Sequence, residues 1–359
     1  SGSGIDIVLG GADGDRIDVG GNDDVVVGDH GFVTWAVRGN PAALRVVHIE
    51  VTDNGVGGDD TIYGRAGEDI LIGGTDGDAI DGGTGRDLIF GDNVRLDRAA
   101  TYGDHTSPRF RVLSGTQIYS TQMLTAGDAL VTATWQNDPD GSTVWDDFRV
   151  TLLDHDVATE NAAADAAAPT AADRFGNDYI AGGADSDMIF GQLGNDVIQG
   201  DGSIDLVSTG VRPDGSAVLD GRTRVGAYRD ADAGYLVVHP SVEAASDGND
   251  YIEAGGGSDV VFGGLGQDDI IGGSSDLYSL LTKDRRPDLG DLIFGGAGTD
   301  IGRNDESPLH GRDSDTIVGD NGEILRLVAA GSNGSTTYRT FTYDTYGETV
   351  RLLPRAVIL

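Results

Sequence analysis

Aspartate residues recur at nine-residue intervals in several parts of this chain, and carboxylate oxygens are ligands for hard metal ions. Each aspartate is followed two positions later by a large aliphatic residue and is preceded by a glycine-rich turn such as Gly73-Gly74. The arrangement matches the pattern G-G-x-G-x-D-x-U-x, in which U is a large aliphatic residue. The clearest run contains Asp60, Asp69, Asp78 and Asp87, with Ile62, Leu71, Ile80 and Ile89 at the aliphatic positions.

The pattern forms five runs, of which the fifth is broken. In that run Gly302 stands where an aliphatic residue is due, and an insertion precedes Asp315. A random acidic linker would not keep aspartate and aliphatic residues in one phase over four repeats, so we predict that the carboxylates bind metal. The predicted ligands are Asp6, Asp15 and Asp24, then Asp60, Asp69, Asp78 and Asp87, then Asp178, Asp187 and Asp196, then Asp250, Asp259 and Asp268, and finally Asp291, Asp300 and Asp315.

Four of the runs end on a glycine-aspartate pair at the same phase of the pattern. A stretch with β-strand character follows each pair, for example Phe32-Val33-Thr34-Trp35. The aspartate of each pair either ligates the last ion of its run or shapes the turn by which the chain leaves it, and the sequence leaves both interpretations open. These aspartates are Asp29, Asp92, Asp201 and Asp320.

The spacing also predicts the elements that hold the carboxylates. Three residues, x-U-x, form a very short strand, and the other six form a turn in which glycine permits positive φ. Two nonapeptides make one coil, so equivalent turns stack on the same edge. Stacked strands lie about 4.8 Å apart; bare carboxylates repel at that spacing, whereas one Ca²⁺, with oxygen ligands at about 2.3–2.6 Å, can contact two turns. The predicted pairs are Asp60 with Asp78, Asp69 with Asp87, Asp6 with Asp24, Asp178 with Asp196, and Asp250 with Asp268.

The aliphatic residue of each repeat is expected to point inward between the two sheets of a roll. One such residue in nine makes a thin core, which does not offset the chain entropy by itself. Metal binding would then supply folding free energy, so we expect a largely disordered metal-free chain and a β-rich calcium-bound chain. Flexible oxygen-only ligation suits Ca²⁺ better than Mg²⁺ or a transition metal.

The composition of the 359-residue chain limits its partners. There are 60 acidic and 24 basic residues, so the formal net charge is -36. This balance argues against nucleic acid and anionic membranes, which need clustered Lys and Arg, and favours multivalent cations.

There is no cysteine, so metal is the expected substitute for the disulfides of secreted proteins. No apolar run approaches the roughly 18 residues of a transmembrane segment. Because Gly4-Ile5-Asp6 is already in phase and no initial methionine is present, we expect a piece of a longer protein.

The repeats resemble those of the RTX family, the haemolysin-type calcium-binding repeat proteins of bacteria. The closest matches are Gly82-Gly-Thr-Gly-Arg-Asp-Leu-Ile-Phe90 and Asp178-Tyr-Ile-Ala-Gly-Gly183. The resemblance covers the five runs, well under half of the chain. It implies a right-handed parallel β-roll with Ca²⁺ in the turns, export of the unfolded chain by type I secretion, and folding at an extracellular or cell-surface location. The chain departs from the usual family pattern because its runs are short and separated by large insertions. We therefore expect a series of small rolls in place of one long roll.

These observations predict an all-β protein in which tandem short parallel β-rolls are interrupted by antiparallel β-hairpin insertions. Hairpin turns are indicated at residues 38–41, 137–141 and 212–215. The expected rolls are residues 1–31, 57–93, 176–202, 247–273 and, in broken form, 290–321. The expected insertions are residues 32–56, 94–175 (β-rich, with an alanine-rich linker from Ala158 to Ala172), 203–246 and 274–289, followed by a β-hairpin tail at residues 322–359.

No enzyme signature such as H-E-x-x-H, G-x-S-x-G or a P-loop is present, so we expect no catalysis. The leading hypothesis is a calcium-binding structural segment of a large secreted or cell-surface bacterial protein, of the adhesin, surface-layer or extracellular fibre type, that associates with copies of itself in a polymer. One alternative is a non-catalytic calcium module of a larger secreted enzyme or toxin.

A second alternative is a glycan-binding module that uses the insertions. Trp35, Trp135 and Trp145 could stack on sugars, although packing within hairpins or the core is the simpler interpretation. His105 and His155 share the longest insertion with Asp104, Asp154 and Asp156, and could form a second metal or acid–base site. Polar residues in turns are the simpler interpretation there also.

Overall fold

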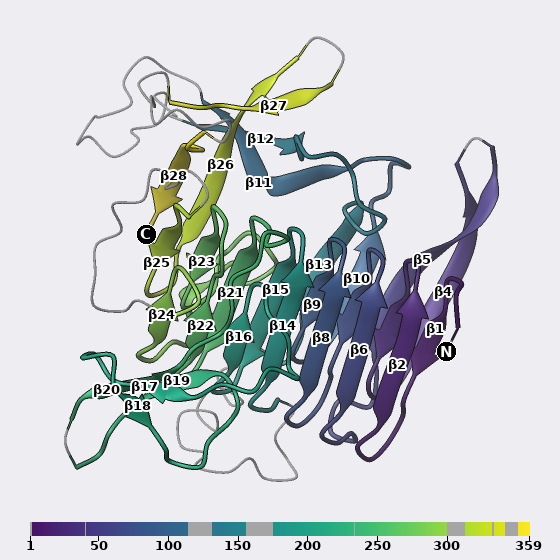
Figure 1. Ribbon diagram of the computed structural model, residues 1–359. Helices are drawn as coiled ribbons and strands as arrows, with labels where there is room; N and C mark the ends of the chain where they lie inside the picture. Colours follow the sequence, from purple (N-terminus) through teal and green to yellow (C-terminus); the bar gives the residue numbers. More distant parts are fainter. Residues whose placement is uncertain are drawn as a thin grey trace.

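The fold is built of β-strands around one long roll. The computed structural model describes residues 2–39, 41–113, 131–155, 175–232, 234–299, 313–331, 334–341 and 351–359. Within these residues the one helical element is a short 3-10 turn, η1 (Lys283–Arg285). Figure 1 shows a central stack of parallel strands that runs from the N-terminal to the C-terminal end of the molecule, with smaller sheets attached to it. The predicted all-β class, with parallel roll strands and antiparallel insertions, is confirmed.

Two parallel sheets form the roll, and the chain passes from one to the other at each nonapeptide. The seven-stranded sheet contains, in order, β2 (Arg16–Gly21), β6 (Thr61–Ala66), β8 (Ala79–Thr84), β14 (Tyr179–Ala184), β16 (Val197–Gln199), β22 (Val260–Phe262) and β24 (Leu292–Phe294). The eight-stranded sheet contains β1 (Ile7–Leu9), β3 (Val25–Val27), β7 (Ile70–Ile72), β9 (Leu88–Phe90), β15 (Met188–Leu193), β21 (Tyr251–Gly256), β23 (Asp269–Ile271) and β25 (Thr316–Val318).

The five runs are joined in one roll, and the expectation of separate small rolls was wrong. Strands on the two sides of an insertion pair in parallel with the aliphatic residues in register, so that Ile80 lies opposite Ile180 just as Ile62 lies opposite Ile80. A roll of three or four rungs would expose unpaired backbone at both ends. Stacking the runs pairs those edges, and the insertions leave the roll through its turns.

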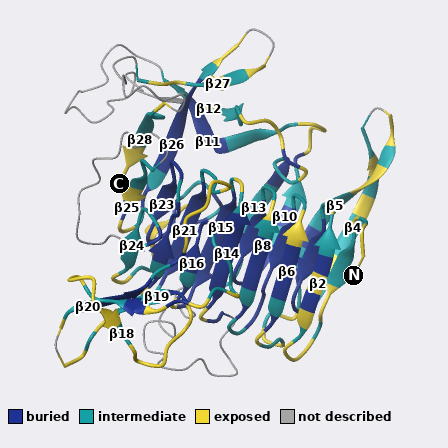
Figure 2. Ribbon diagram, in the orientation of Figure 1, coloured by how far each residue is buried: buried dark blue, intermediate teal, exposed yellow. Residues whose placement is uncertain are grey.

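The aliphatic residue of each repeat points into the space between the two sheets, as predicted. Ile62, Leu71 and Ile80 are fully buried there. A second core lies outside the roll, and the sequence analysis did not foresee it. The outer face of the eight-stranded sheet, including Phe90 and Phe190, packs against residues of the insertions such as Leu96 and Ile324. Figure 2 shows the roll strands buried over most of their length, while the exposed residues gather in turns and insertion tips.

Three further sheets cover the roll. The first has the order β13 (Phe148–Leu152), β10 (Val94–Arg98), β5 (Ala43–Val51), β4 (Gly31–Arg38) and is antiparallel. The second contains β12 (Val131–Asn137), β11 (Thr106–Leu113), β26 (Glu323–Ala330), β27 (Thr336–Tyr338) and β28 (Arg355–Ile358). The third, β18 (Ala217–Val218), β17 (Gly210–Val211), β20 (Leu236–His239) and β19 (Gly226–Arg229), belongs to an insertion whose Val225 and Val238 pack on the outer face of the seven-stranded sheet.

Two of the indicated turns connect hairpins and one does not. β4 pairs with β5 around residues 38–41, and β17 pairs with β18 around residues 212–215. The turn at 137–141 was expected to join two paired strands, but β12 pairs with β11 and β13 pairs with β10. Both flanking strands pair with earlier strands of the same insertion, so this turn connects two different sheets. The alanine-rich stretch from Ala158 to Ala172 lies outside the described residues.

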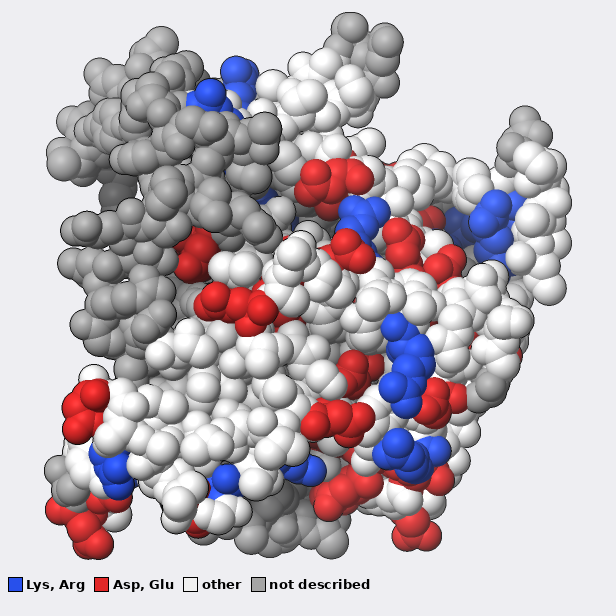
Figure 3. All heavy atoms as spheres, viewed as in Figure 1, with Lys and Arg blue, Asp and Glu red and all other residues white. Residues whose placement is uncertain are grey.

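Some of the surface charges are paired locally. Figure 3 shows several basic side chains lying next to acidic ones on the visible face. Arg65 and Asp18 form such a pair, with a 2.5 Å contact between Arg65 Nη2 and Asp18 Oδ2 and each side chain 46% exposed. Pairs of this kind contribute about 0–1 kcal/mol because water screens both charges.

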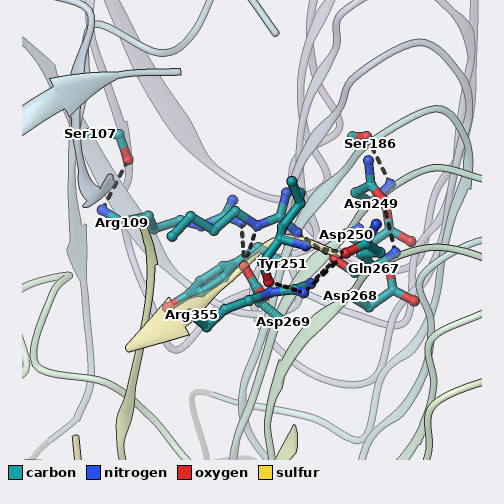
Figure 4. Close-up of polar contacts among 12 residues, drawn as sticks. Ser107, Arg109, Ser186, Asn249, Asp250, Tyr251, Gln267, Asp268, Asp269 and Arg355 are labelled. Atoms are coloured by element: carbon teal, nitrogen blue, oxygen red, sulfur yellow. Dashed lines mark hydrogen bonds and ion pairs between the residues drawn. The ribbon is translucent and has the colours of Figure 1, made fainter. Parts of the chain in front are cut away.

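A buried charge cluster fastens the C-terminal strands to the roll. Asp269 on β23 is fully buried and accepts hydrogen bonds from Arg326 Nε at 2.5 Å, Arg355 Nε at 2.8 Å and Arg109 Nη2 at 3.3 Å. These arginines come from β26, β28 and β11, and Figure 4 shows Arg109 and Arg355 converging on Asp269 beside Tyr251. Burial alone would raise the pKa of Asp269, but the three guanidinium groups hold it below its usual value.

Removing this carboxylate should loosen the second insertion sheet. Asp269→Ala leaves three arginines without their shared counter-charge, and breaking a buried ion pair costs about 3–5 kcal/mol. We expect a loss of that size in urea unfolding at saturating calcium. Asp18→Ala, which removes an exposed partner, should cost no more than about 1 kcal/mol. Equal losses in the two variants would show that the cluster does not anchor the sheet.

Candidate metal centre

Two rows of aspartates run along the edges of the roll, one carboxylate for each coil. We call them the first and second aspartate ladders. In each, the backbone N–H of one aspartate donates to Oδ1 of the aspartate one coil further on, at 2.6–3.0 Å. The first ladder is Asp15, Asp60, Asp78, Asp178, Asp196, Asp259 and Asp291. The second is Asp6, Asp24, Asp69, Asp87, Asp187, Asp250, Asp268 and Asp315.

All five predicted pairs are ladder neighbours, and the insertions do not interrupt the rows. Asp60 donates to Asp78, 18 residues away, at 2.7 Å, and Asp78 donates to Asp178, 100 residues away, at 2.8 Å. Fifteen of the predicted ligands therefore lie in two continuous rows. Asp300 is outside the described residues.

The second carboxylate oxygen along both ladders is buried and lacks a hydrogen-bond partner among the described residues. An unsatisfied buried oxygen is costly, and an unpaired buried charge more so, so these atoms require a positive partner or a proton. The oxygens are Oδ2 of Asp24, Asp60, Asp69, Asp78, Asp87, Asp178, Asp187, Asp196, Asp250, Asp259, Asp268 and Asp291.

The glycine at the start of each turn leaves room beside the unpartnered oxygen. A Cβ on Gly73 would lie 2.2 Å from Asp78 Oδ2 and 2.3 Å from the carbonyl oxygen of Gly91 in the next coil. A Cβ on Gly82 would likewise lie 2.4 Å from Asp87 Oδ2. Carboxylate and carbonyl oxygens thus converge on a space that only glycine keeps open. Hard oxygen ligands without nitrogen or sulfur are the donor set that Ca²⁺ prefers, so the residues fit this ion.

The ladder carboxylates from Asp24 onward have raised pKa values, because burial disfavours their ionised form. Burial raises the pKa of Asp69 to about 7. Burial, together with the charge of Asp178, raises the pKa of Asp78 well above its usual range. A bound cation would reverse this effect, because its charge favours the ionised form of each neighbouring carboxylate.

The described part of the chain contains no group of three or more Asp, Glu, His or Cys side chains suited to one metal ion. This finding is consistent with the ladders. Each space between turns receives few side-chain oxygens, and main-chain carbonyl oxygens would supply the other ligands of an ion.

The four aspartates that end the runs take different positions. Asp29 and Asp201 lie inside the turn stacks, where each retains one buried oxygen without a described partner. Both oxygens of Asp92 accept backbone N–H groups, from Gly176 at 3.1 Å and Leu193 at 2.8 Å. Asp92 therefore shapes the exit turn, while Asp29 and Asp201 have an oxygen free for a cation. Asp320 is exposed.

One carboxylate at the roll edge was missed from the sequence. Both oxygens of Asp288 are buried without a hydrogen-bond partner among the described residues. A Cβ on Gly273 would lie 2.9 Å from Asp288 Oδ2 and 2.7 Å from Asn321 Oδ1. Burial, then the charge of Asp291, raises the pKa of Asp288 to about 7. The sequence signal that could have identified Asp288 is its position three residues before the ladder aspartate Asp291, next to the Gly290 turn.

The histidines of the longest insertion do not form a common site. His105 pairs with Asp146, whose carboxylate the sequence analysis did not link to it. His155 is buried, with Nδ1 3.2 Å from the carbonyl oxygen of Arg285, and burial lowers its pKa to about 4. Asp156 lies outside the described residues.

Comparison with known families agrees with the ladder geometry. Four segments, residues 1–32, 54–89, 174–207 and 245–276, match the family model of the RTX calcium-binding nonapeptide repeat. They coincide with the first four runs, and the chain therefore carries four copies of this calcium-binding repeat. The resemblance found in the sequence is confirmed. No curated protein matches the chain.

Replacing one ladder aspartate should remove a calcium ligand. Asp78→Asn keeps the shape of the side chain but deletes the charge of a buried oxygen. A site filled at about 100 times its Kd contributes about 2.7 kcal/mol, so we expect a loss of about 2–3 kcal/mol at saturating calcium and fewer ions bound by calorimetry. Asp76→Asn is the matched control: Asp76 lies in the same turn with φ 70°, which Asn tolerates, and its loss should stay within about 0.5 kcal/mol.

Metal-free stability should fall as pH rises. Burial raises the folded-state pKa to about 7 from its ordinary value of 3.8 for five ladder aspartates, namely Asp60, Asp69, Asp178, Asp250 and Asp315. The folded chain then binds more protons than the unfolded chain between these values. Its proton-linked stability is complete below pH about 4 and is lost as pH rises through about 7. In excess chelator we expect more β signal at pH 5 than at pH 8.

Calcium should reverse the direction of this pH effect. Protons compete with Ca²⁺ for the same oxygens, so the calcium concentration at half-folding should rise as pH falls below about 7. A metal-free β signal that is equal at the two pH values would contradict the assignment of the raised pKa values to the folded state.

Proposed function

We propose that this chain is a calcium-stiffened, non-catalytic structural segment of a large bacterial protein that is exported and folds outside the cell, of the adhesin, surface-layer or fibre type. The observation that carries the proposal is the continuity of the two aspartate ladders, which follow the roll through every insertion. A protein that placed a few calcium sites for local purposes would not need an unbroken row on both edges.

Calcium concentration acts as the folding signal for such a roll. Each site stabilises the folded state by RT ln(1 + [Ca²⁺]/Kd), which is close to zero when calcium is scarce and about 2.7 kcal/mol at 100 times Kd. The twelve ladder oxygens that are buried without a hydrogen-bond partner among the described residues make the sum over sites large compared with the usual net stability of about 5–15 kcal/mol. The chain would therefore stay open in calcium-poor cytoplasm, where self-repulsion among its acidic residues also opposes compaction.

The linear arrangement supports a mechanical role. Within the roll, each coil pairs only with the coils next to it, as in other repeat proteins, so stiffness is built from repeated nearest-neighbour contacts. The chain has no cysteine, so ions take the place of disulfides as cross-links between coils. None of the described residues forms a helix that is long and apolar enough to cross a membrane.

Calcium should convert the chain from a largely disordered to a β-rich, elongated form. We expect a cooperative gain of β signal in circular dichroism, and a matching fall in the radius of gyration, on titration with Ca²⁺ at pH 8. Mg²⁺ should be far less effective, because it demands rigid octahedral geometry and dehydrates reluctantly. The same β signal in excess chelator as in millimolar Ca²⁺ would refute the coupling.

Electron microscopy of the native material separates the structural role from that of an attached calcium module. Ordered polymers that dissolve on chelation are expected. Monodisperse particles in calcium would contradict the proposed assembly into polymers but would not contradict calcium-dependent folding.

A further inference from the structure

A cavity lies where the two larger insertion sheets meet over the roll. Its floor is Leu88 of β9 and Met188 of β15, two neighbouring strands of the eight-stranded sheet. Its walls come from β13 on one side, from β11 and β12 on another, and from the insertion at 274–289. The cavity volume is about 310 Å³, within the range of small-molecule sites. Three segments far apart in the sequence build this space, and the calcium ladders do not contribute to it.

Aromatic side chains form two of its walls. The ring nitrogen of Trp145 donates to the carbonyl oxygen of Arg86 at 2.8 Å, which fixes the indole against a turn of the roll. Trp135 of β12 also belongs to the lining, with the guanidinium carbon of Arg149 5.4 Å from its ring centre. Fixed aromatic surfaces of this kind bind flat apolar faces at little entropic cost.

The polar groups of the lining include both a donor and an acceptor. Arg149 donates to Asp104 Oδ2 at 2.9 Å, which orients its guanidinium group. The Asp146 side chain is 10% exposed, and its Oδ2 is buried with no hydrogen-bond partner among the described residues. One cationic and one anionic side chain leave the lining without a net charge, and Ser107 adds a hydroxyl group.

We infer that this cavity binds a neutral carbohydrate. A sugar ring presents apolar C–H faces, which suit Trp135 and Trp145, and hydroxyl groups that both donate and accept hydrogen bonds, which suit the Ser107 hydroxyl group and the Arg149 guanidinium group of the lining. An alkylammonium ligand would meet Arg149, and an anionic ligand would meet Asp146, so balanced charge disfavours both. A purely apolar ligand would cover these polar groups without adding a hydrogen bond to them. The site goes beyond the structural role proposed above and does not depend on it.

The test starts with a glycan array probed with the calcium-loaded chain. At least one neutral oligosaccharide is expected to bind, and its Kd is then measured by calorimetry. Trp135→Ala should weaken that binding by at least tenfold, because it removes a stacking face. Trp35→Ala is the matched control, since Trp35 is 49% exposed on β4 and lies outside this cavity, and it should leave the Kd unchanged.

A second variant covers the case in which Trp135→Ala fails to fold. Leu281 lines the cavity and is 73% exposed, so Leu281→Arg should narrow the mouth without disturbing a core, and should also weaken binding at least tenfold. Calcium-dependent circular dichroism checks the fold of each variant. An array blank for neutral glycans, a Kd unaffected by Leu281→Arg, or quenching of tryptophan fluorescence by hexyltrimethylammonium in place of sugar would overturn the inference.

Discussion

The repulsion between stacked, buried carboxylates is the constraint on which this structure depends. Every coil places one aspartate on each edge of the roll, and the hydrogen bond between neighbours, such as Asp69 N–H to Asp87 Oδ1 at 2.8 Å, uses only one oxygen of each. The other oxygen is buried beside a glycine and a carbonyl group. Without a cation or a proton, the repulsion between these charges destabilises the fold. A Ca²⁺ ion bound by the same oxygens would instead hold adjacent coils together. We therefore propose that the roll is stable only where calcium or acid is supplied.

This constraint explains how the roll accommodates such long insertions. Closing a loop costs about (3/2)RT ln n, so extending the separation between neighbouring ladder aspartates from 18 residues, as in Asp60 to Asp78, to 100, as in Asp78 to Asp178, adds only about 1.5 kcal/mol. One filled calcium site offsets more than that. The register of the roll is thus insensitive to what leaves its turns, provided that the next aspartate and aliphatic residue return in phase.

The ladder neighbours could be predicted from the nine-residue spacing because stacking is a local consequence of turn length. The continuity of the roll could not, since pairing across an insertion is a long-range event that spacing does not encode. The outer core left a signal that was overlooked: the early strands of the eight-stranded sheet, such as Ile70-Leu71-Ile72, are apolar throughout, whereas the early strands of the other sheet alternate, as in Arg16-Ile17-Asp18. Strands buried on both faces have that composition. The turn at 137–141 was recognisable from the sequence, but its flanking strands, β12 and β13, pair with β11 and β10 and not with each other.

The outer core also links the insertions to the ions. Phe90 and Phe190 stack with ring centres 5.1 Å apart on the outer face of the eight-stranded sheet, and they form a surface for the insertion sheets only while β9 and β15 stay paired. That pairing brings Asp87 beside Asp187, two buried carboxylates that repel unless a cation or proton intervenes. Loss of calcium would consequently separate the strands beneath the insertions as well as the coils themselves. The short repeats and the long insertions are thus parts of one calcium-dependent unit, in which the ladder sets whether the attached sheets have a surface on which to assemble.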